Sequence, residues 1–200
     1  MKKGILAFVL LIGCFSNAQN FSFGFKGGYN LAGIQGDNAN GFQMRHGFHL
    51  GAMGELALTN TFSIQPEIMY SQQGAKQNAI FIFDNFPLAD DKLEARYNFL
   101  NIPIMAKYYV LKGLSIELGP QIGFLLSAEQ ENEVQNIDVK DRLKSIDFGV
   151  NFGIAYKFSN GLSFGLRYNA GLTNINDVTG FLDENRYGVV QLSIGYFLRK

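Results

Sequence analysis

The chain has 200 residues, of which 47% are hydrophobic, and its 17 basic and 17 acidic residues cancel. This length suits one domain, and so large an apolar fraction excludes an intrinsically disordered chain. Without a basic excess to attract phosphate groups, nucleic acid is excluded as a partner. The 23 glycines and the 14% aromatic content indicate β-structure with tightly packed positions.

The first predicted element is a cleavable signal peptide over residues 1–18. Lys2 and Lys3 precede a short apolar stretch, and Ser16-Asn17-Ala18 supplies the small residues after which a signal peptidase cleaves. The apolar stretch is far shorter than the roughly 20 residues that a transmembrane helix needs. Residues 19–200 are therefore expected to form one exported domain.

A second interpretation of the same segment stays open. Leu11-Ile12-Gly13-Cys14 also fits a lipoprotein signal, which would leave an acylated Cys14 instead of cleavage after Ala18.

Residues 19–200 show strict alternation of apolar residues with small or polar ones, the pattern of β-strands with two unlike faces. In the first run, Phe23 and Phe25 alternate with Gly24 and Lys26. The pattern predicts eight strands, at residues 21–31, 48–58, 62–71, 100–108, 114–126, 148–158, 162–172 and 190–198.

Short and long connections alternate between these strands. The short ones lie near Thr59-Asn60, Leu111-Lys112 and Ser159-Asn160-Gly161, and the long ones span 32–45, 72–97, 128–145 and 173–186. An even strand number with this alternation is typical of transmembrane barrels with short periplasmic turns and long extracellular loops. The predicted fold is an all-β, eight-stranded antiparallel barrel in the outer membrane of a Gram-negative cell, with both termini in the periplasm.

A soluble secreted barrel or sandwich would show the same alternation with its faces reversed. The placement of charge separates the two. No strand carries a charge on its apolar face, as expected where a basic residue at the bilayer midplane costs roughly 2–4 kcal/mol. Tyr29 and Tyr70 fall near one end of the apolar band, and Tyr108, Tyr156 and Tyr196 near the other, which predicts two aromatic girdles.

The polar face is expected to enclose charges of both signs. An eight-stranded barrel is just wide enough for side chains to fill, so these charges should pair with one another. Lys107 and Glu117 would lie opposite each other across a short turn at Lys112. The charges are interpreted either as structural filler or as a gated polar path for small solutes or ions. The predicted interior set is Lys26, Glu55, Glu67, Lys107, Glu117, Asp147, Lys157 and Arg167.

No catalytic, cofactor or metal site is predicted. His46 and His49 are the only histidines, and a spacing of three places them on opposite faces of a strand, so no His-Ser pair or two-His metal site forms locally. Gly24, Gly27 and Gly28 are followed by no helix and do not form a phosphate loop. A lipid-modifying enzyme would require long-range assembly of a nucleophile and a base.

The second long connection contains an apolar cluster between Ile80 and Leu88 that includes Phe81, Phe83 and Phe86. It is expected either to cover the barrel mouth or extend the flanking strands above the membrane, or to contact a partner protein, a ligand or lipopolysaccharide.

Several segments together resemble the PorT-like outer-membrane β-barrel family. They are Phe99 to Tyr109 (FLNIPIMAKYY), Leu118 to Leu125 (LGPQIGFL), Asp147-Phe148-Gly149, and Arg167-Tyr168 before Gly171-Leu172-Thr173. The resemblance spans nearly the whole mature chain and implies the barrel fold and an outer-membrane location. One member type assists protein secretion, a role that these packing motifs do not transfer.

The sequence thus predicts an outer-membrane barrel with a structural or surface-interaction role. A narrow porin-like channel is the alternative, and an outer-membrane lipid-modifying enzyme is the third hypothesis. The expected partners are outer-membrane lipid and lipopolysaccharide, the barrel-assembly machinery, and a surface or periplasmic protein that the sequence does not identify.

Overall fold

The computed structural model describes residues 21–36, 42–83, 86–131, 136–174 and 185–198. The expected signal peptide, with Cys14 and Ala18, lies outside these residues. No helix in the described part of the chain is long and apolar enough to cross a membrane. The described elements are β1 (Phe21–Gly36), β2 (Phe42–Ala57), β3 (Phe62–Phe83), β4 (Phe86–Leu111), β5 (Leu114–Glu131), β6 (Asn136–Asp138), the 3-10 turn η2 (Lys140–Arg142), β7 (Ile146–Lys157), β8 (Leu162–Gly171) and β9 (Asn185–Phe197).

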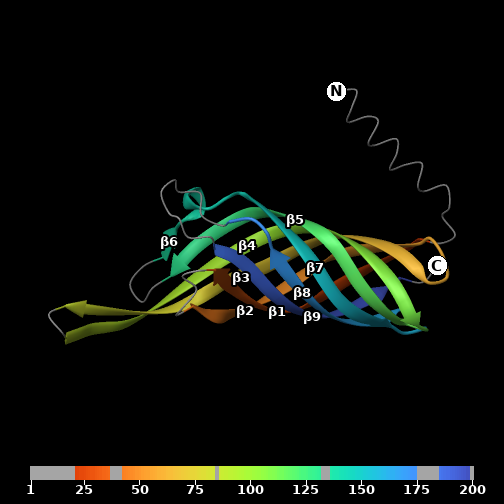
Figure 1. The fold of residues 1–200 in the computed structure, drawn as a ribbon, viewed down its shortest axis with the longest axis horizontal. Helices are drawn as coiled ribbons and strands as arrows, with labels where there is room; N and C mark the ends of the chain where they lie inside the picture. The colour runs from red at the N-terminus through yellow and green to blue at the C-terminus, as the bar shows by residue number, and fades with distance from the viewer. Residues whose placement is uncertain (1–20, 37–41, 84–85, 132–135, 175–184, 199–200) are drawn as a thin grey trace, which may run out of the picture.

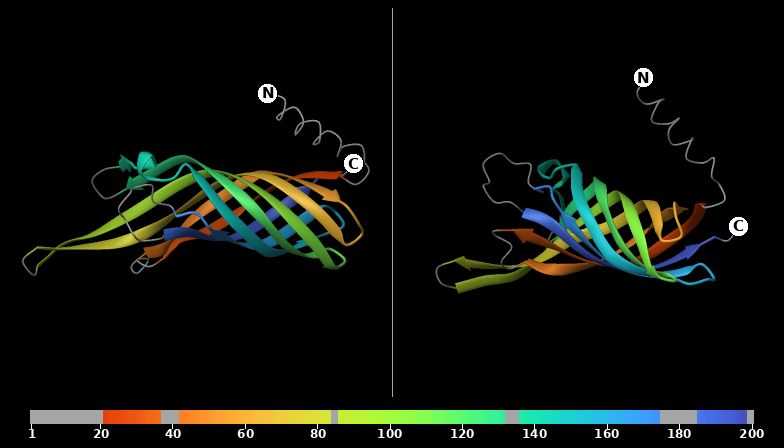
Figure 2. Two further views of the ribbon diagram at one scale, coloured as in Figure 1. Left: turned by 45° about the horizontal axis from the view of Figure 1, so that its top comes forward. Right: turned by 45° about the vertical axis from the view of Figure 1, so that its right-hand side comes forward.

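Eight of these strands close into an antiparallel barrel (Figures 1 and 2). Neighbours in the wall follow the chain order, and β1 closes the ring by pairing with β9, from Gly24 opposite Phe197 to Gly36 opposite Asn185. The short β6 pairs only with the end of β5 and lies outside the ring. The eight-stranded barrel predicted from the alternation is confirmed.

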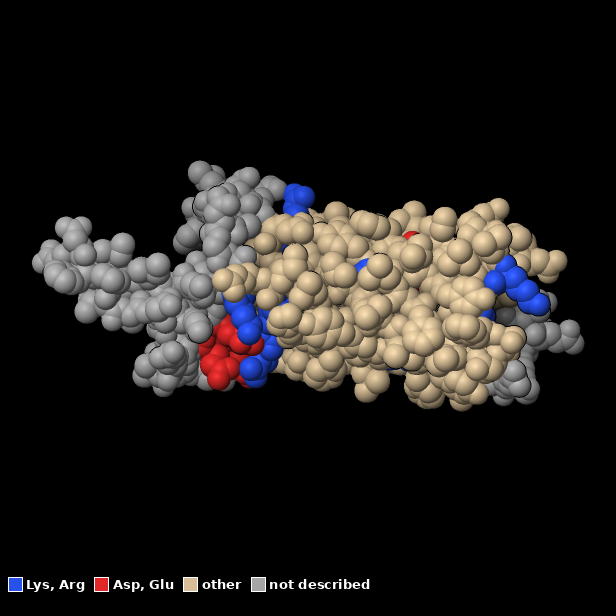
Figure 3. All heavy atoms as spheres, turned by 90° about the horizontal axis from the view of Figure 1, so that it is seen from below, with Lys and Arg blue, Asp and Glu red and all other residues tan. Residues whose placement is uncertain are grey.

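The two faces of the wall are those that the alternation predicts. Phe25 is 53% exposed on the outer face, whereas its neighbour Lys26 is buried inside. Seen from one side, the barrel surface is almost entirely uncharged; Lys and Arg lie at both ends, and Asp and Glu gather beside them at one end (Figure 3). An apolar outer band around a polar interior is the arrangement of a barrel that faces lipid.

Tight turns lie at one end of the barrel, called here the turn end. They join β2 to β3, β4 to β5 and β7 to β8, where short connections were predicted. Gly113 (φ 87°) and Gly161 (φ 92°) adopt the left-handed backbone conformation that two of these turns require. The described chain also begins and ends here, because Leu198 donates a backbone hydrogen bond to the carbonyl of Phe23.

The opposite end, called the loop end, differs from the expectation. The strands run well into the segments predicted as long loops: β1 reaches Gly36, β2 begins at Phe42, and β3 and β4 continue to Phe83 and from Phe86. The physical reason is that backbone pairing continues beyond the apolar band. Water contacts both faces of the sheet there, so a strand can form without alternating apolar and polar residues.

The longest extension is a two-stranded ribbon formed by residues 78–83 of β3 and 86–93 of β4. Pairing of β3 with β2 ends at Gln77 and pairing of β4 with β5 ends at Glu94, so beyond these points the two strands pair only with each other within the described residues. Figure 1 shows the ribbon projecting past the rest of the barrel. Phe81, Phe83 and Phe86 lie on the strands of this ribbon, and only their backbone is described. Of the two structural alternatives predicted for this segment, the structure therefore shows the extension of the flanking strands and not a cover over the barrel mouth.

Candidate functional site

The barrel interior contains a linear chain of seven charged side chains in which cations and carboxylates alternate, called here the charge chain. Each carboxylate lies between two cations. From the turn end inward, the contacts are Lys157 Nζ–Glu55 Oε2 at 2.9 Å, Glu55 Oε2–Lys107 Nζ at 3.7 Å, Lys107 Nζ–Glu117 Oε1 at 3.1 Å, Glu117 Oε2–Arg167 Nη2 at 3.0 Å, Arg167 Nη2–Glu67 Oε1 at 2.9 Å and Glu67 Oε2–Lys26 Nζ at 2.9 Å.

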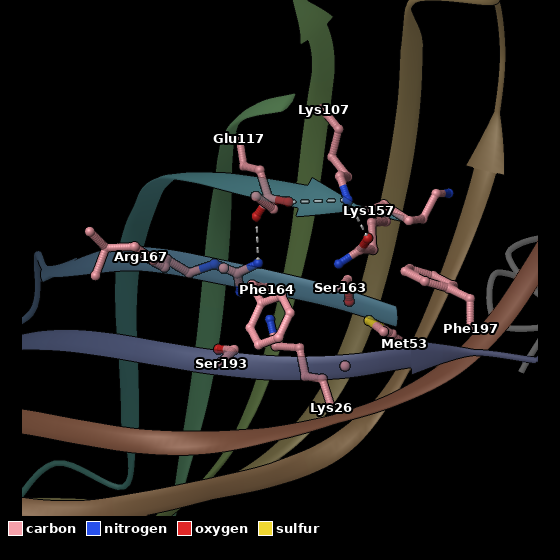
Figure 4. A pocket seen from close by; sticks show the side chains of 15 residues that line it. Lys26, Met53, Lys107, Glu117, Lys157, Ser163, Phe164, Arg167, Ser193 and Phe197 are labelled. Carbon is pink, nitrogen blue, oxygen red and sulfur yellow. Dashed lines mark hydrogen bonds and ion pairs between the residues drawn. The ribbon is translucent and has the colours of Figure 1, made fainter. Parts of the chain in front are cut away.

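Strand register brings these side chains together. Lys107 and Glu117 occupy directly opposite positions on β4 and β5, on either side of the turn at Lys112-Gly113, as the sequence analysis expected. Arg167 comes from β8, on the far side of the barrel, and its two terminal nitrogens bind both Glu67 oxygens at 2.9 Å. The bidentate contact fixes the geometry at the middle of the interior. In Figure 4, dashed lines join Glu117 to Lys107 on one side and to Arg167 on the other.

Asp147 does not join the charge chain, which corrects the expectation of four cations balanced by four carboxylates. It lies near the loop end of β7, opposite Gly123, and its Oδ1 is buried without a hydrogen-bond partner. The described chain of charges therefore has four cations and three carboxylates. Alternation along a strand predicts that a side chain points inward. It does not predict whether an oppositely charged side chain lies at the same level along the barrel axis.

A layer of uncharged polar side chains lies beyond the charge chain, toward the loop end. Its centre is His49, whose Nδ1 lies 2.7 Å from Asn30 Oδ1 and whose Nε2 lies 2.9 Å from Ser193 Oγ. The Asn30 amide nitrogen donates to the carbonyls of Phe48 and Gln72, so its Oδ1 must accept from His49. His49 therefore carries its proton on Nδ1, and the Ser193 hydroxyl donates to Nε2.

This arrangement is the long-range His-Ser pair that the sequence could not supply locally. Ser193 borders a cavity with Lys26 and Arg167 (Figure 4), but the cavity volume is about 30 Å³. That is the space of a single water molecule and holds no ester or lipid substrate. His46 lies on the outer face against Tyr29, so the two histidines occupy opposite faces as predicted. No group of three or more potential metal-ligating side chains occurs among the described residues.

An apolar cluster spans the interior near the loop end. Tyr187 of β9 packs edge-on against Tyr97 and Phe99 of β4, with ring centroids 5.7 and 5.5 Å apart. Val139, which follows β6, is buried in the same cluster, and its backbone N–H donates to the Ala128 carbonyl. Sequence reasoning missed this cluster. The available signal was the doubled apolar positions Phe99-Leu100 and Leu125-Leu126, which place one apolar side chain on each face.

The turn end is open by comparison. Two adjoining hollows of about 690 and 580 Å³ lie there, and both are lined by Tyr109, Lys112, Gly113 and Lys157. We call them together the turn-end vestibule. Volumes of this size fall within the range of ligand pockets.

A smaller set of ion pairs lies at the loop end, beyond the apolar band. Glu94 accepts from Arg45 Nε at 2.8 Å and lies 3.4 Å from Lys76 Nζ. Burial alone would raise the pKa of the Glu94 carboxyl, but the hydrogen bond from Arg45 and the charges of Arg45 and Lys76 outweigh burial and lower that pKa below its usual value. This carboxylate is 30% exposed and provides a surface comparison for the buried ones.

Residues 17–177 match the outer membrane protein beta-barrel domain family. The chain belongs to this family. This outer-membrane β-barrel protein matches no functionally curated protein in sequence.

Several solved structures share the fold. The attachment invasion locus protein Ail of Yersinia pestis is 12% identical and matches 88% of this chain and 98% of its own, with a TM-score of 0.50. Neisserial surface protein A is 16% identical over 87% of this chain and 96% of its own, with a TM-score of 0.53. A major outer membrane protein of Thermus thermophilus is 11% identical over 89% of this chain and 99% of its own, with a TM-score of 0.52. At these identities the likeness establishes the fold alone.

Proposed function

We propose that this outer-membrane β-barrel protein is a surface-interaction protein that contacts a partner polypeptide through the β3–β4 ribbon. The observation that carries the proposal is that, within the described part of the chain, residues 78–83 and 86–93 pair only with each other beyond the barrel wall. Each outer edge of such a ribbon presents unpaired backbone N–H and C=O groups, with which an extended peptide can pair as an added strand.

The two edges of the ribbon are not equivalent. Residues 86–93 include Pro87, which lacks an N–H, and the charged run Asp90-Asp91-Lys92, all features that discourage edge pairing. Residues 78–83 (NAIFIF) include no charge and no proline. The free edge of β3 is therefore the favoured place for a partner strand, and the apolar residues around Phe81 and Phe83 would supply its specificity.

A variant lacking Ile80 to Leu88 should lose the partner while the barrel remains folded, because the wall strands and interior contacts lie below the deletion. The test is photo-crosslinking on intact cells from position 79, with position 60 in a turn as the control site. A discrete polypeptide adduct from position 79 is expected, and Ile82→Lys should abolish it. Leu88→Lys is the matched control, because the β4 edge already carries charge. An adduct that persists in the deletion variant would contradict the proposal.

The narrow channel is the second candidate, favoured by the turn-end vestibule and the charged interior. We expect the refolded protein to show no stable conductance steps in planar bilayers, because the apolar cluster spans the interior near the loop end and the interior cavity holds about one water molecule. Steps that change in a Glu117→Ala/Lys107→Ala double variant would establish a conducting path instead.

We also propose an orientation, a delivery route, a non-catalytic role and a subfamily for the protein. The turn end faces the periplasm and the ribbon faces the exterior, in keeping with short periplasmic turns in such barrels. The protein is delivered by cleavage after Ala18, inserted by the barrel-assembly machinery and surrounded by outer-membrane lipid and lipopolysaccharide. It has no catalytic role, since Ser193 and His49 are buried beside a water-sized cavity. Within the outer membrane protein beta-barrel domain family, we propose that the chain is of the PorT-like type, on the basis of the sequence motifs that resemble it.

A further inference from the structure

The charge chain has a cation at each end. Three carboxylates separate four cations, so the described chain carries one positive charge in excess. Its inner end, Lys26, is buried and held by Glu67. Its outer end, Lys157, is 27% exposed and opens into the turn-end vestibule.

The surroundings of Lys157 add positive charge and aromatic surface. Its Nζ lies 4.6 Å from the centroid of the Phe197 ring and 5.8 Å from that of Tyr109. Lys112 lines both hollows and forms no ion pair within the described residues. Glu55 is the one carboxylate among the described lining residues, and Lys107 and Lys157 already share it. A fourth negative charge placed here would complete the alternation.

The larger hollow reaches across the rim of the barrel. Its lining includes Tyr109, Lys157 and Phe197 from the interior side. It also includes Tyr156, Phe158 and Leu198, which are exposed on the outer, lipid-facing side. A ligand that fits both sides has an anionic head and an apolar tail.

We propose that the turn-end vestibule binds the phosphate of an anionic phospholipid headgroup between Lys157 and Lys112, with the acyl chains along Tyr156, Phe158 and Leu198. The phosphate supplies the fourth negative charge, which no carboxylate among the described residues provides, and the aromatic side chains hold the interfacial part of the lipid. The site is independent of the β3–β4 ribbon.

The test is native mass spectrometry of the refolded protein in neutral detergent, titrated with phosphatidylglycerol or with zwitterionic phosphatidylcholine. The wild type should bind phosphatidylglycerol at least tenfold more tightly. Lys157→Gln and Lys112→Gln should each reduce this preference, and the double variant should abolish it. Lys144→Gln, an exposed lysine at the loop end, should leave it unchanged.

Folding is not expected to confound the test. Lys157→Gln leaves three cations and three carboxylates in the charge chain, and Lys112 lies on an exposed turn, so Lys112→Gln alone suffices if the first variant does not refold. Glycerol phosphate is the soluble comparison. Failure of glycerol phosphate to bind supports a lipid, whereas binding with the same lysine dependence would replace the lipid with a free phosphate. Equal affinity of the wild type for the two lipids, or a preference retained in the double variant, would overturn the site.

Discussion

Replacing Glu67 with glutamine is expected to lower the free energy of unfolding by about 3–5 kcal/mol, the usual effect of removing one partner from a buried ion pair. Glu67 is fully buried and binds Lys26 at 2.9 Å and both terminal nitrogens of Arg167. Without its charge, Lys26 loses its only ion pair in the described structure, in surroundings where an unpaired ammonium is costly. Urea unfolding of the protein in phospholipid vesicles measures the change.

Glu94→Gln is the matched control. Glu94 also binds two cations, but it is partly exposed at the loop end, so its loss should lower the free energy of unfolding by less than about 1 kcal/mol. The Lys26→Met/Glu67→Gln double variant should lose less unfolding free energy than the sum of the losses of the two single variants, by at least about 1 kcal/mol. The reason is that each substitution removes the same contact. Equal losses from Glu67→Gln and Glu94→Gln would show that the buried chain contributes no more than a surface pair.

Replacing Gly28 with alanine is expected to destabilise the barrel by about 3 kcal/mol or more, at the upper end of overpacking effects. Gly28 lies opposite His49 on one side and Ser193 on the other. An added Cβ would run into the Leu192 carbonyl oxygen and would lie 2.8 Å from Ser193 Cα and 2.9 Å from His49 Cε1. Two of these atoms belong to the backbone, so the strands themselves would have to separate.

Gly33 on the same strand provides the comparison. A Cβ added there meets only Met44 Cγ, at 3.7 Å, which is an ordinary contact. Gly33→Ala should therefore unfold within a few degrees of the wild-type temperature. Gly28→Ala should lower the unfolding temperature markedly or prevent refolding. Heat-modifiable migration on gels follows both variants. Similar behaviour of the two variants would mean that the wall adjusts freely around His49.

Much of the barrel wall was predictable because lipid on one face and a narrow interior on the other require apolar residues to alternate with small or polar ones along each strand. Phe25 and Lys26 illustrate this, since each can occupy only one face at its position. The turn at Lys112-Gly113 then fixed which residues of β4 and β5 oppose each other, including Lys107 and Glu117. Local pattern is sufficient wherever the partner is the adjacent strand of a short hairpin.

The remaining features depend on contacts across the barrel. His49 and Ser193 are 144 positions apart in the chain, and no local spacing reports their meeting. Asp147 shows the same limit, because its inward direction was predictable and its lack of a partner was not. The apolar cluster near the loop end was missed for another reason: inward aromatic residues such as Phe99 and Tyr187 have the same composition as lipid-facing ones, so alternation alone does not distinguish an interior cluster from an outer surface.

The charge chain also has a bearing on how the barrel forms. Its members come from β1, β2, β3, β4, β5, β7 and β8, so among the described residues β9 is the one wall strand that contributes none. A partly zipped sheet would expose unpaired Lys or Arg side chains to lipid, at roughly 2–4 kcal/mol each near the midplane. Closure by β9 therefore seals a network that is complete only when all the other strands are in register. Insertion should be cooperative, with misregistered intermediates too unstable to persist in the bilayer.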